Sequence, residues 1–180
     1  MSFLPPTKIL CEPQKSEADQ GKRPPLKKVS VKDSPLWAVN IMNGTRLRFH
    51  DITCNSTALQ APYGTNWVQN TDGFNTMDAS DVELTGFYYQ GGDDCVAIKP
   101  RSYNISIRNV TCHGGNGIAI GSLGQYLEDS SVENVTIRDV HVQTYNEDMH
   151  NSAYIKTWIG ELASQGSSYE SAGLPRGGGW

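Results

Sequence analysis

The sequence predicts an all-β fold, a right-handed, single-stranded parallel β-helix, and three observations support this. Four segments repeat one pattern, in which apolar and polar residues alternate until an Asn, Asp or Gly bends the chain. The first apolar residues of these segments lie 35, 23 and 30 residues apart, at Leu47, Val82, Ile105 and Val135. No segment shows sustained helical periodicity. Strands that recur in this way are typical of a solenoid. A β-sandwich is the alternative, but it does not explain why the bend recurs.

Residues 1–35 do not fit the repeat and are predicted to form a poorly ordered basic segment. Residues 1–33 carry seven Lys and Arg against four acids, a net charge of +3, whereas the rest of the chain carries eight against fifteen, a net charge of −7. The lysines are dispersed among polar residues with almost no aromatics, which favours a solvated arm over a nucleic-acid partner. No apolar run is long enough to span a bilayer, so we expect no membrane partner.

The repeats occupy residues 46–54, 81–87, 104–112 and 134–142, and a further strand is predicted over residues 153–158. Together they define one partial β-helix domain over residues 36–180. In a stack of coils the apolar side chains form interior columns, and successive strands lie about 4.8 Å apart. Residues separated by one coil therefore lie side by side on the same face.

Three aspartates are predicted to meet on one face of this stack. Asp93 follows Asp72 by 21 residues and Asn116 follows Asp94 by 22, and each interval is close to one coil. Lys156, in the last predicted strand, is expected on the same face one or two coils later. Crowded carboxyls raise one another's affinity for protons, so one stays protonated near neutral pH while another is ionised. General acid–base catalysis needs such a pair. The alternative interpretation is that these aspartates only cap turns.

An acidic cluster on a β-helix face indicates a polysaccharide groove, because inverting hydrolysis of a glycosidic bond uses one protonated and one ionised carboxyl. Lys156 adds a cation suited to the carboxylate of a uronic acid. Cys95 and Cys112 lie 17 residues apart and flank the acid-rich segment. A disulfide between them is the preferred interpretation, and buried free thiols are the alternative. The four cysteines have no metal-ligand spacing, so we predict no metal and no cofactor.

Four ordered motifs resemble those of the polygalacturonases, glycoside hydrolase family 28, over about residues 36–162. They are Asn70-Thr71-Asp72, Gly92-Asp93-Asp94-Cys95, the glycine-rich run from Cys112 to Gly124, and Tyr154-Ile155-Lys156. The resemblance implies a β-helix of the pectin-lyase-like type and inverting hydrolysis of α-1,4-linked galacturonate in pectin. It also implies that Asp93 is the general acid, that Asp72 and Asp94 position and activate water, and that Cys95 pairs with Cys112.

Two departures from the family pattern fall where substrate is bound. Asn116 stands where the family usually has a histidine, and Tyr154 replaces an arginine that would hold a carboxylate at two points. The three aspartates are retained, so the chain resembles the exo-acting fungal branch that acts on galacturonan or rhamnogalacturonan. Asn70, His113 and Tyr126 are the other predicted substrate-binding residues. The alternative for His113 is a turn residue, and for Tyr126 it is a residue that covers the core edge.

The resemblance implies a tube roughly twice as long as this chain provides, because an open solenoid end exposes apolar columns. We therefore expect a truncated β-helix, a portion of a longer enzyme that is weakly active or inactive alone. Five Asn-x-Ser/Thr sequons predict a secreted glycoprotein, here a monomer, whose signal peptide has been lost with the truncation. The sequons are Asn43, Asn55, Asn104, Asn109 and Asn134.

Two rival functions stay open beside the leading prediction of an exo-acting pectin hydrolase, whose partner is a pectic polysaccharide. In a calcium-dependent pectate lyase on a similar β-helix, clustered aspartates bind metal and move no protons. In the second rival the solenoid is not an enzyme at all, and it either binds pectin or is a structural remnant.

Overall fold

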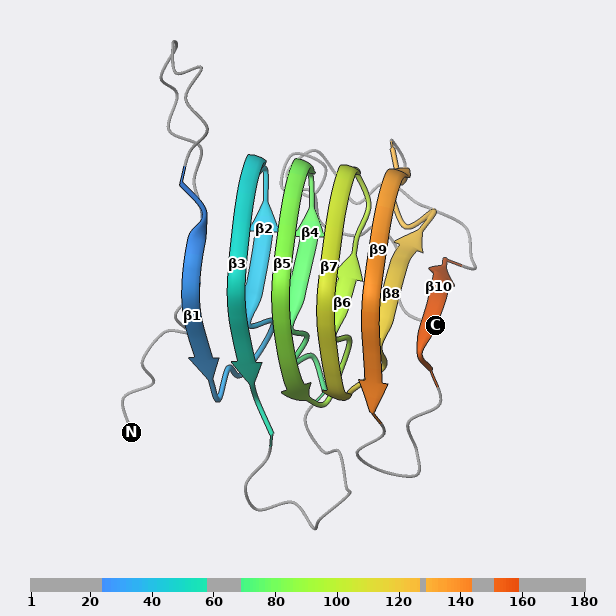
Figure 1. Cartoon of the computed structure of the whole chain (residues 1–180). Coiled ribbons are helices and arrows are strands. Elements are labelled where there is room, and N and C mark those ends of the chain that lie inside the picture. The colour runs from blue at the N-terminus through green and yellow to red at the C-terminus, as the bar shows by residue number, and fades with distance from the viewer. Residues whose placement is uncertain (1–23, 58–68, 127–128, 144–150, 159–180) are drawn as a thin grey trace, which may run out of the picture.

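Two parallel sheets make up the part of the chain that the computed structural model describes, residues 24–57, 69–126, 129–143 and 151–158. The odd-numbered strands form one sheet in the order β1–β3–β5–β7–β9, and the even-numbered strands form the other in the order β10–β8–β6–β4–β2. Figure 1 shows the first sheet in front of the second. The strands are β1 (Leu26–Lys32), β2 (Val39–Met42), β3 (Thr45–Asn55), β4 (Phe74–Met77), β5 (Ala79–Gly91), β6 (Val96–Ile98), β7 (Ser102–Gly114), β8 (Ile118–Leu123), β9 (Val132–Gln143) and β10 (Ala153–Thr157).

Every strand pairing among the described residues is parallel. This confirms the predicted right-handed parallel β-helix and excludes the β-sandwich, whose sheets are antiparallel. Within the described residues there is no helix with the length and apolar character needed to cross a membrane.

The first sheet carries the core as columns of apolar side chains that run from coil to coil. In one column Phe49, Leu84, Ile107 and Ile137 follow one another in register. The first three are at most 5% exposed, whereas Ile137 on β9 is half-buried. Full burial of one such side chain stabilises the fold by about 1.5–3 kcal/mol. The apolar half of the sequence alternation is therefore the inward face of this sheet.

The bend predicted from the repeat is present and falls at equivalent positions in successive coils. Asp51, Gly86, Asn109 and Asp139 all have positive φ, between 55° and 73°, at matching positions of β3, β5, β7 and β9. Asn, Asp and Gly adopt this left-handed conformation at the least cost. The structure differs from the prediction in one respect. Pairing continues through the bend, so each repeat is one strand of 11 to 13 residues.

The strand β1 lies inside the segment 1–35, for which no coil was predicted. It pairs in parallel with β3, and Val29 and Val31 pack against the core. The sequence analysis read the lysines of this stretch as a solvated arm, but they occupy the exposed face of a strand whose valines point inward. The described β-helix thus includes residues before position 36, and residues 1–23 lie outside the described part.

Candidate active site

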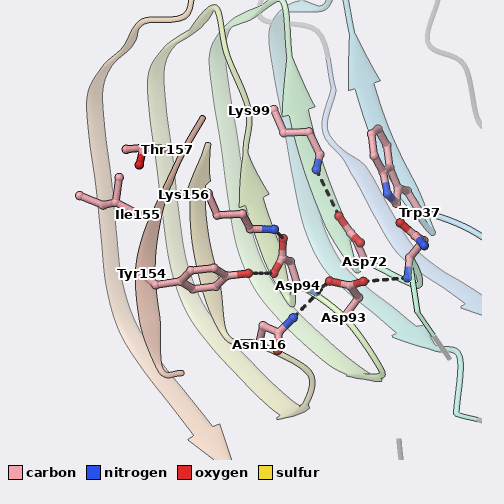
Figure 2. Close-up of a pocket in the computed structure, with 11 residues that line it drawn as sticks. Trp37, Asp72, Asp93, Asp94, Lys99, Asn116, Tyr154, Ile155, Lys156 and Thr157 are labelled. Atoms are coloured by element: carbon pink, nitrogen blue, oxygen red, sulfur yellow. Dashed lines mark hydrogen bonds and ion pairs between the residues drawn. The ribbon is translucent and has the colours of Figure 1, made fainter. Parts of the chain in front are cut away.

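Three turns that lead into the second sheet bring the predicted aspartates together. Asp72 precedes β4, Asp93 and Asp94 precede β6, and Asn116 precedes β8. The Gly73 N–H donates to the Asp94 carbonyl at 2.8 Å, and the Asn116 N–H donates to the Asp93 carbonyl at 3.0 Å, so the turns stack on one another. One carboxylate oxygen from each aspartate lies within 4.8 Å of the other two. The acids therefore meet at one place, as the one-coil spacing predicted (Figure 2).

Asp93 accepts hydrogen bonds from three N–H groups. The backbone N–H of Asn70 donates to Oδ2 at 2.7 Å. The backbone N–H of Asp94 donates to Oδ1 at 2.9 Å, and the side-chain amide of Asn116 donates to the same oxygen at 3.3 Å. Asn70 has a φ of 59°, a left-handed conformation that asparagine tolerates. These contacts hold the Asp93 carboxylate in one orientation beside the other two acids.

Asp94 is 1% exposed and is paired with β10. Lys156 Nζ lies 2.6 Å from Oδ2, and the Tyr154 hydroxyl donates to Oδ1. The Lys156 ammonium also lies 5.2 Å from the centroid of the Tyr154 ring, within cation–π range. Burial, together with the contact to Asp94, raises the pKa of Tyr154, so its hydroxyl stays a donor. Tyr154 therefore supports the acid cluster through a hydrogen bond that an arginine would have made with charge.

Asp72 is 3% exposed and faces a second lysine. Lys99 Nζ lies 3.4 Å from Oδ2 and 4.1 Å from the centroid of the Trp37 ring. Burial raises the pKa of Asp72 to about 6, Lys99 opposes that rise, and the two neighbouring aspartates add to it. One carboxyl of the three thus holds its proton into the mildly acidic range. Crowding contributes to this as expected, but burial is the larger cause.

A buried tyrosine connects the cluster to the core of the first sheet. Tyr89 is fully buried, and its hydroxyl accepts a hydrogen bond from the Asp93 backbone N–H at 2.9 Å. The hydroxyl hydrogen is directed to the carbonyls of Thr71, at 2.9 Å, and Asp93, at 3.1 Å. Burial raises the pKa of Tyr89, so this donor is kept. The sequence analysis missed Tyr89, because a tyrosine within a strand pattern reads as an ordinary core residue.

The predicted disulfide between Cys95 and Cys112 is confirmed, with a Cα–Cα distance of 5.7 Å. It ties the turn that carries the paired aspartates to β7. Gly115 in the next coil approaches the same turn, where a Cβ atom would lie 1.9 Å from the Asp93 carbonyl oxygen, and its φ is +73°. Only glycine permits this approach. Cys54 is free and buried, and Cys11 lies outside the described residues.

A cleft of about 490 Å³ surrounds the cluster, and all the residues discussed so far as polar partners line it except Tyr89 and Thr71. Its lining residues are Trp37, Asn70, Asp72, Asp93, Asp94, Lys99, Asn116, Tyr154, Ile155, Lys156 and Thr157. Lys99 and Trp37 were not among the predicted site residues. Lys99 follows an apolar run in the sequence, and Trp37 was interpreted as a packing residue.

Two predicted substrate-binding residues do not line this cleft. His113 lies on the face of β7 opposite the inward Cys112, with Nδ1 3.5 Å from the Tyr88 hydroxyl. Tyr126 is 9% exposed and packs under the Arg101 guanidinium, 4.5 Å from its ring centroid. Strand alternation directs His113 outward, and the chain after β8 carries Tyr126 to the core edge. The structure thus gives both residues the alternative roles weighed from the sequence.

The aspartate cluster also offers the oxygen ligands that calcium prefers. Two ammonium groups already neutralise it, because Lys156 contacts Asp94 and Lys99 contacts Asp72. A divalent cation among these oxygens would be repelled by both lysines. The arrangement therefore favours proton transfer over metal binding, and the absence of a metal requirement stays a prediction.

Comparisons with known proteins agree with this chemistry. The profile of glycosyl hydrolases family 28 matches residues 10–170. A protein of Aspergillus niger that carries the name galacturan 1,4-alpha-galacturonidase C is 73% identical over 150 residues, which are 83% of this chain and 35% of that protein. An exopolygalacturonase of Cochliobolus carbonum is 32% identical over 141 residues, which are 78% of this chain and 30% of that protein. The chain spans about a third of the length of these curated relatives.

Proposed function

This chain belongs to family 28 of the glycosyl hydrolases, and we propose that the protein hydrolyses α-1,4-linked galacturonate from the ends of pectic polysaccharides. The observation that carries the proposal is the cluster of three aspartates, whose oxygens lie within 4.8 Å of one another between two lysines. Such a cluster supplies proton donor and acceptor, and the lysines match an anionic substrate. The names of the relatives, a galacturan galacturonidase and an exopolygalacturonase, support the substrate and the exo mode.

In the proposed reaction Asp93 protonates the glycosidic oxygen while the bond from that oxygen to the anomeric carbon breaks. Asp72 and Asp94 hold the attacking water, whose oxygen bonds to the anomeric carbon and whose proton passes to Asp94. The ion pair with Lys156 suits Asp94 to this role. The raised pKa of Asp72 keeps a proton within the cluster below about pH 6. A single water can relay that proton over the 4.8 Å or less that separates the acids.

The stereochemical outcome provides one test. Carboxyl groups stand about 6.5–9.5 Å apart in inverting glycosidases and about 5–5.5 Å apart in retaining ones. Oxygens of this cluster lie within 4.8 Å, so inversion here rests on the family resemblance and on a water held jointly by two acids. Proton NMR of the first product measures the outcome. We expect β-galacturonate, and α-galacturonate as the first product would overturn inversion.

The role of Asp93 is tested by Asp93→Asn, with Asp72→Asn as the matched control. Loss of a general acid lowers hydrolysis of polygalacturonate by about 10²–10⁴-fold. An aryl α-galacturonide is spared, because its phenol leaves without protonation. We expect this difference between substrates for Asp93→Asn and an equal loss on both for Asp72→Asn. The reverse result would assign the general acid to Asp72.

The rival functions are separated by products and by chelation. A calcium-dependent lyase loses activity in EDTA and releases unsaturated products, and either result would overturn hydrolysis. A solenoid that only binds pectin retains polygalacturonate without turnover in the wild type and in Asp93→Asn alike. Release of monomer alone supports the exo mode, whereas a mixture of oligomers contradicts it.

We also propose that the protein acts outside the cell as a glycosylated monomer, because polymeric pectin is an extracellular substrate. The five sequons support this location. Peptide mass spectrometry of the protein from a secreting host measures their occupancy, and light scattering measures the oligomeric state. Unmodified asparagines at all five positions would contradict the proposal.

A further inference from the structure

Two lysine–aromatic pairs stand on opposite flanks of the aspartate cluster, as Figure 2 shows. On one flank Lys156 lies 5.2 Å from the ring centroid of Tyr154. On the other Lys99 lies 4.1 Å from the ring centroid of Trp37. Each lysine contacts one buried aspartate, and both pairs line the same cleft. The cleft therefore presents a cation and an aromatic face on each side of the reacting groups.

The Lys99 ammonium is less engaged than that of Lys156. Its contact with Asp72 is 3.4 Å long, whereas Lys156 lies 2.6 Å from Asp94. An ammonium has three N–H donors, and Asp72 is the one side-chain acceptor of Lys99 among the described residues. The Lys99 side chain is 14% exposed, and it borders the cleft. When Asp72 takes up a proton, near pH 6, Lys99 loses its paired anion. The cleft then holds a cation that an incoming carboxylate can neutralise.

We propose that Lys99 and Trp37 form a second uronate subsite, which binds the galacturonate residue on the Asp72 side of the scissile bond. Lys156 serves the sugar on the other side. The half-buried indole offers an apolar platform for a sugar ring and holds the ammonium beside it. The inference rests on the proposed function, because it requires a substrate that carries carboxylates.

This second subsite assigns a substrate class. With one cation on each flank, the site requires a uronate on both sides of the cleaved bond. Galacturonan meets this requirement at every linkage. Rhamnogalacturonan alternates galacturonate with rhamnose, which has no carboxylate, so one lysine would face a neutral sugar at each linkage. The geometry therefore selects galacturonan over rhamnogalacturonan.

The experiment compares digalacturonate with its two mono-methyl esters, which neutralise one sugar or the other. Wild type should be slower on each ester by about tenfold or more in kcat/KM, the effect of losing one charge-assisted contact. Lys99→Met should be slow on digalacturonate and indifferent to one ester only. Lys156→Met should be indifferent to the other ester. Discrimination against both esters by Lys99→Met would overturn the subsite.

A purely electrostatic role of Lys99 on Asp72 gives a different pattern. Lys99→Met would then shift the pH profile of kcat equally for all three substrates and leave KM unchanged, which would also overturn the proposal. Lys99→Arg keeps the charge and should restore discrimination, and Lys99→Gln replaces Lys99→Met if the latter does not fold. Lys27→Met removes an exposed lysine from β1 and should behave as wild type.

A binding measurement separates this inference from the proposed function. Digalacturonate and its esters are titrated calorimetrically into wild type and Lys99→Gln. If wild type shows no turnover of digalacturonate, hydrolysis is overturned, but the titration still decides the subsite. Weaker binding of digalacturonate by Lys99→Gln, with binding of one ester unchanged, supports it. Equal affinity of the two proteins for digalacturonate overturns it.

Discussion

The first sheet, β1–β3–β5–β7–β9, and the second sheet, β10–β8–β6–β4–β2, use their residues for different purposes. In the first sheet β3, β5, β7 and β9 are 11 to 13 residues long and bury columns of apolar side chains. The strands of the second sheet are 3 to 6 residues long, and the turns that lead into them carry the acid cluster. Long apolar strands stabilise the coil, and short strands with polar turns position the chemistry.

This difference has an energetic consequence. Buried carboxyls cost free energy even when they are paired, because desolvation opposes the ion pair. Asp72 and Asp94 are 3% and 1% exposed, so the site reduces the stability that the first sheet supplies. Tyr89 and the Cys95–Cys112 disulfide connect the two regions and keep the turns in place. Substitutions in the two regions should therefore change stability with opposite signs.

The largest effect is expected from Ile107→Ala in the first sheet. Ile107 is 1% exposed in the central column, and truncation of a buried isoleucine leaves a cavity that costs about 2–5 kcal/mol. Ser106→Ala, at an exposed position of the same strand, should change the free energy of unfolding by less than about 0.5 kcal/mol. Urea unfolding monitored by circular dichroism measures both variants. Equal stability of the two would contradict the view that the columns of the first sheet stabilise the coil.

The same contrast explains what the sequence revealed. The repeats of the first sheet carry an alternation and a bend that residue types alone disclose. The strands β4 and β6 are four and three residues long and buried throughout, so they show no alternation. The acid cluster was still predictable, because the one-coil spacing holds for turns as well as strands. A regular solenoid therefore makes its sites readable even where its short strands are not.

What the spacing did not disclose depends on side-chain reach. Lys99 is 27 residues from Asp72, more than the predicted coil, and meets it because the long side chain spans neighbouring turns. Trp37 comes from the turn before β2, next to residues that were assigned to a solvated arm. His113 is in the glycine-rich motif, but strand alternation sends it to the outer face. Proximity in sequence to a motif was a poorer guide than the facing direction in the strand.

The intermediate effect is expected from Asp72→Asn, which should stabilise the fold at neutral pH. The pKa of this carboxyl is about 6 in the folded chain, above its unfolded value, so its contribution to stability is full below the unfolded pKa. That contribution is lost as pH rises through 6. The corresponding cost at pH 7 is about 3 kcal/mol at most, and the pairing of Asp72 with Lys99 offsets part of it.

Unfolding of Asp72→Asn and wild type is therefore compared at pH 7 and at pH 3.5. We expect a gain of about 1–3 kcal/mol at pH 7 and almost none at pH 3.5. Asp139→Asn is the control, because this aspartate is exposed at a bend that asparagine also adopts. A variant less stable than wild type at pH 7 would show that the site contributes to stability, and the contrast between the sheets would fail.

The smallest effect is expected at a second row of left-handed residues, on the exposed face of the first sheet. Asn104 has a φ of 55°, donates its amide to Asp81 Oδ1 at 3.0 Å and accepts from the Asn134 amide at 2.7 Å. Asn104→Ala loses both bonds and the tolerance of positive φ, which costs about 1–2 kcal/mol. Asn104→Gly keeps the conformation and should lose less. Both are measured by urea unfolding of protein made in a bacterium, so that the sequon at Asn104 plays no part. Because this row lies outside the cleft, hydrolysis should be unchanged, and a loss of activity in Asn104→Gly would show that the first sheet also tunes the site.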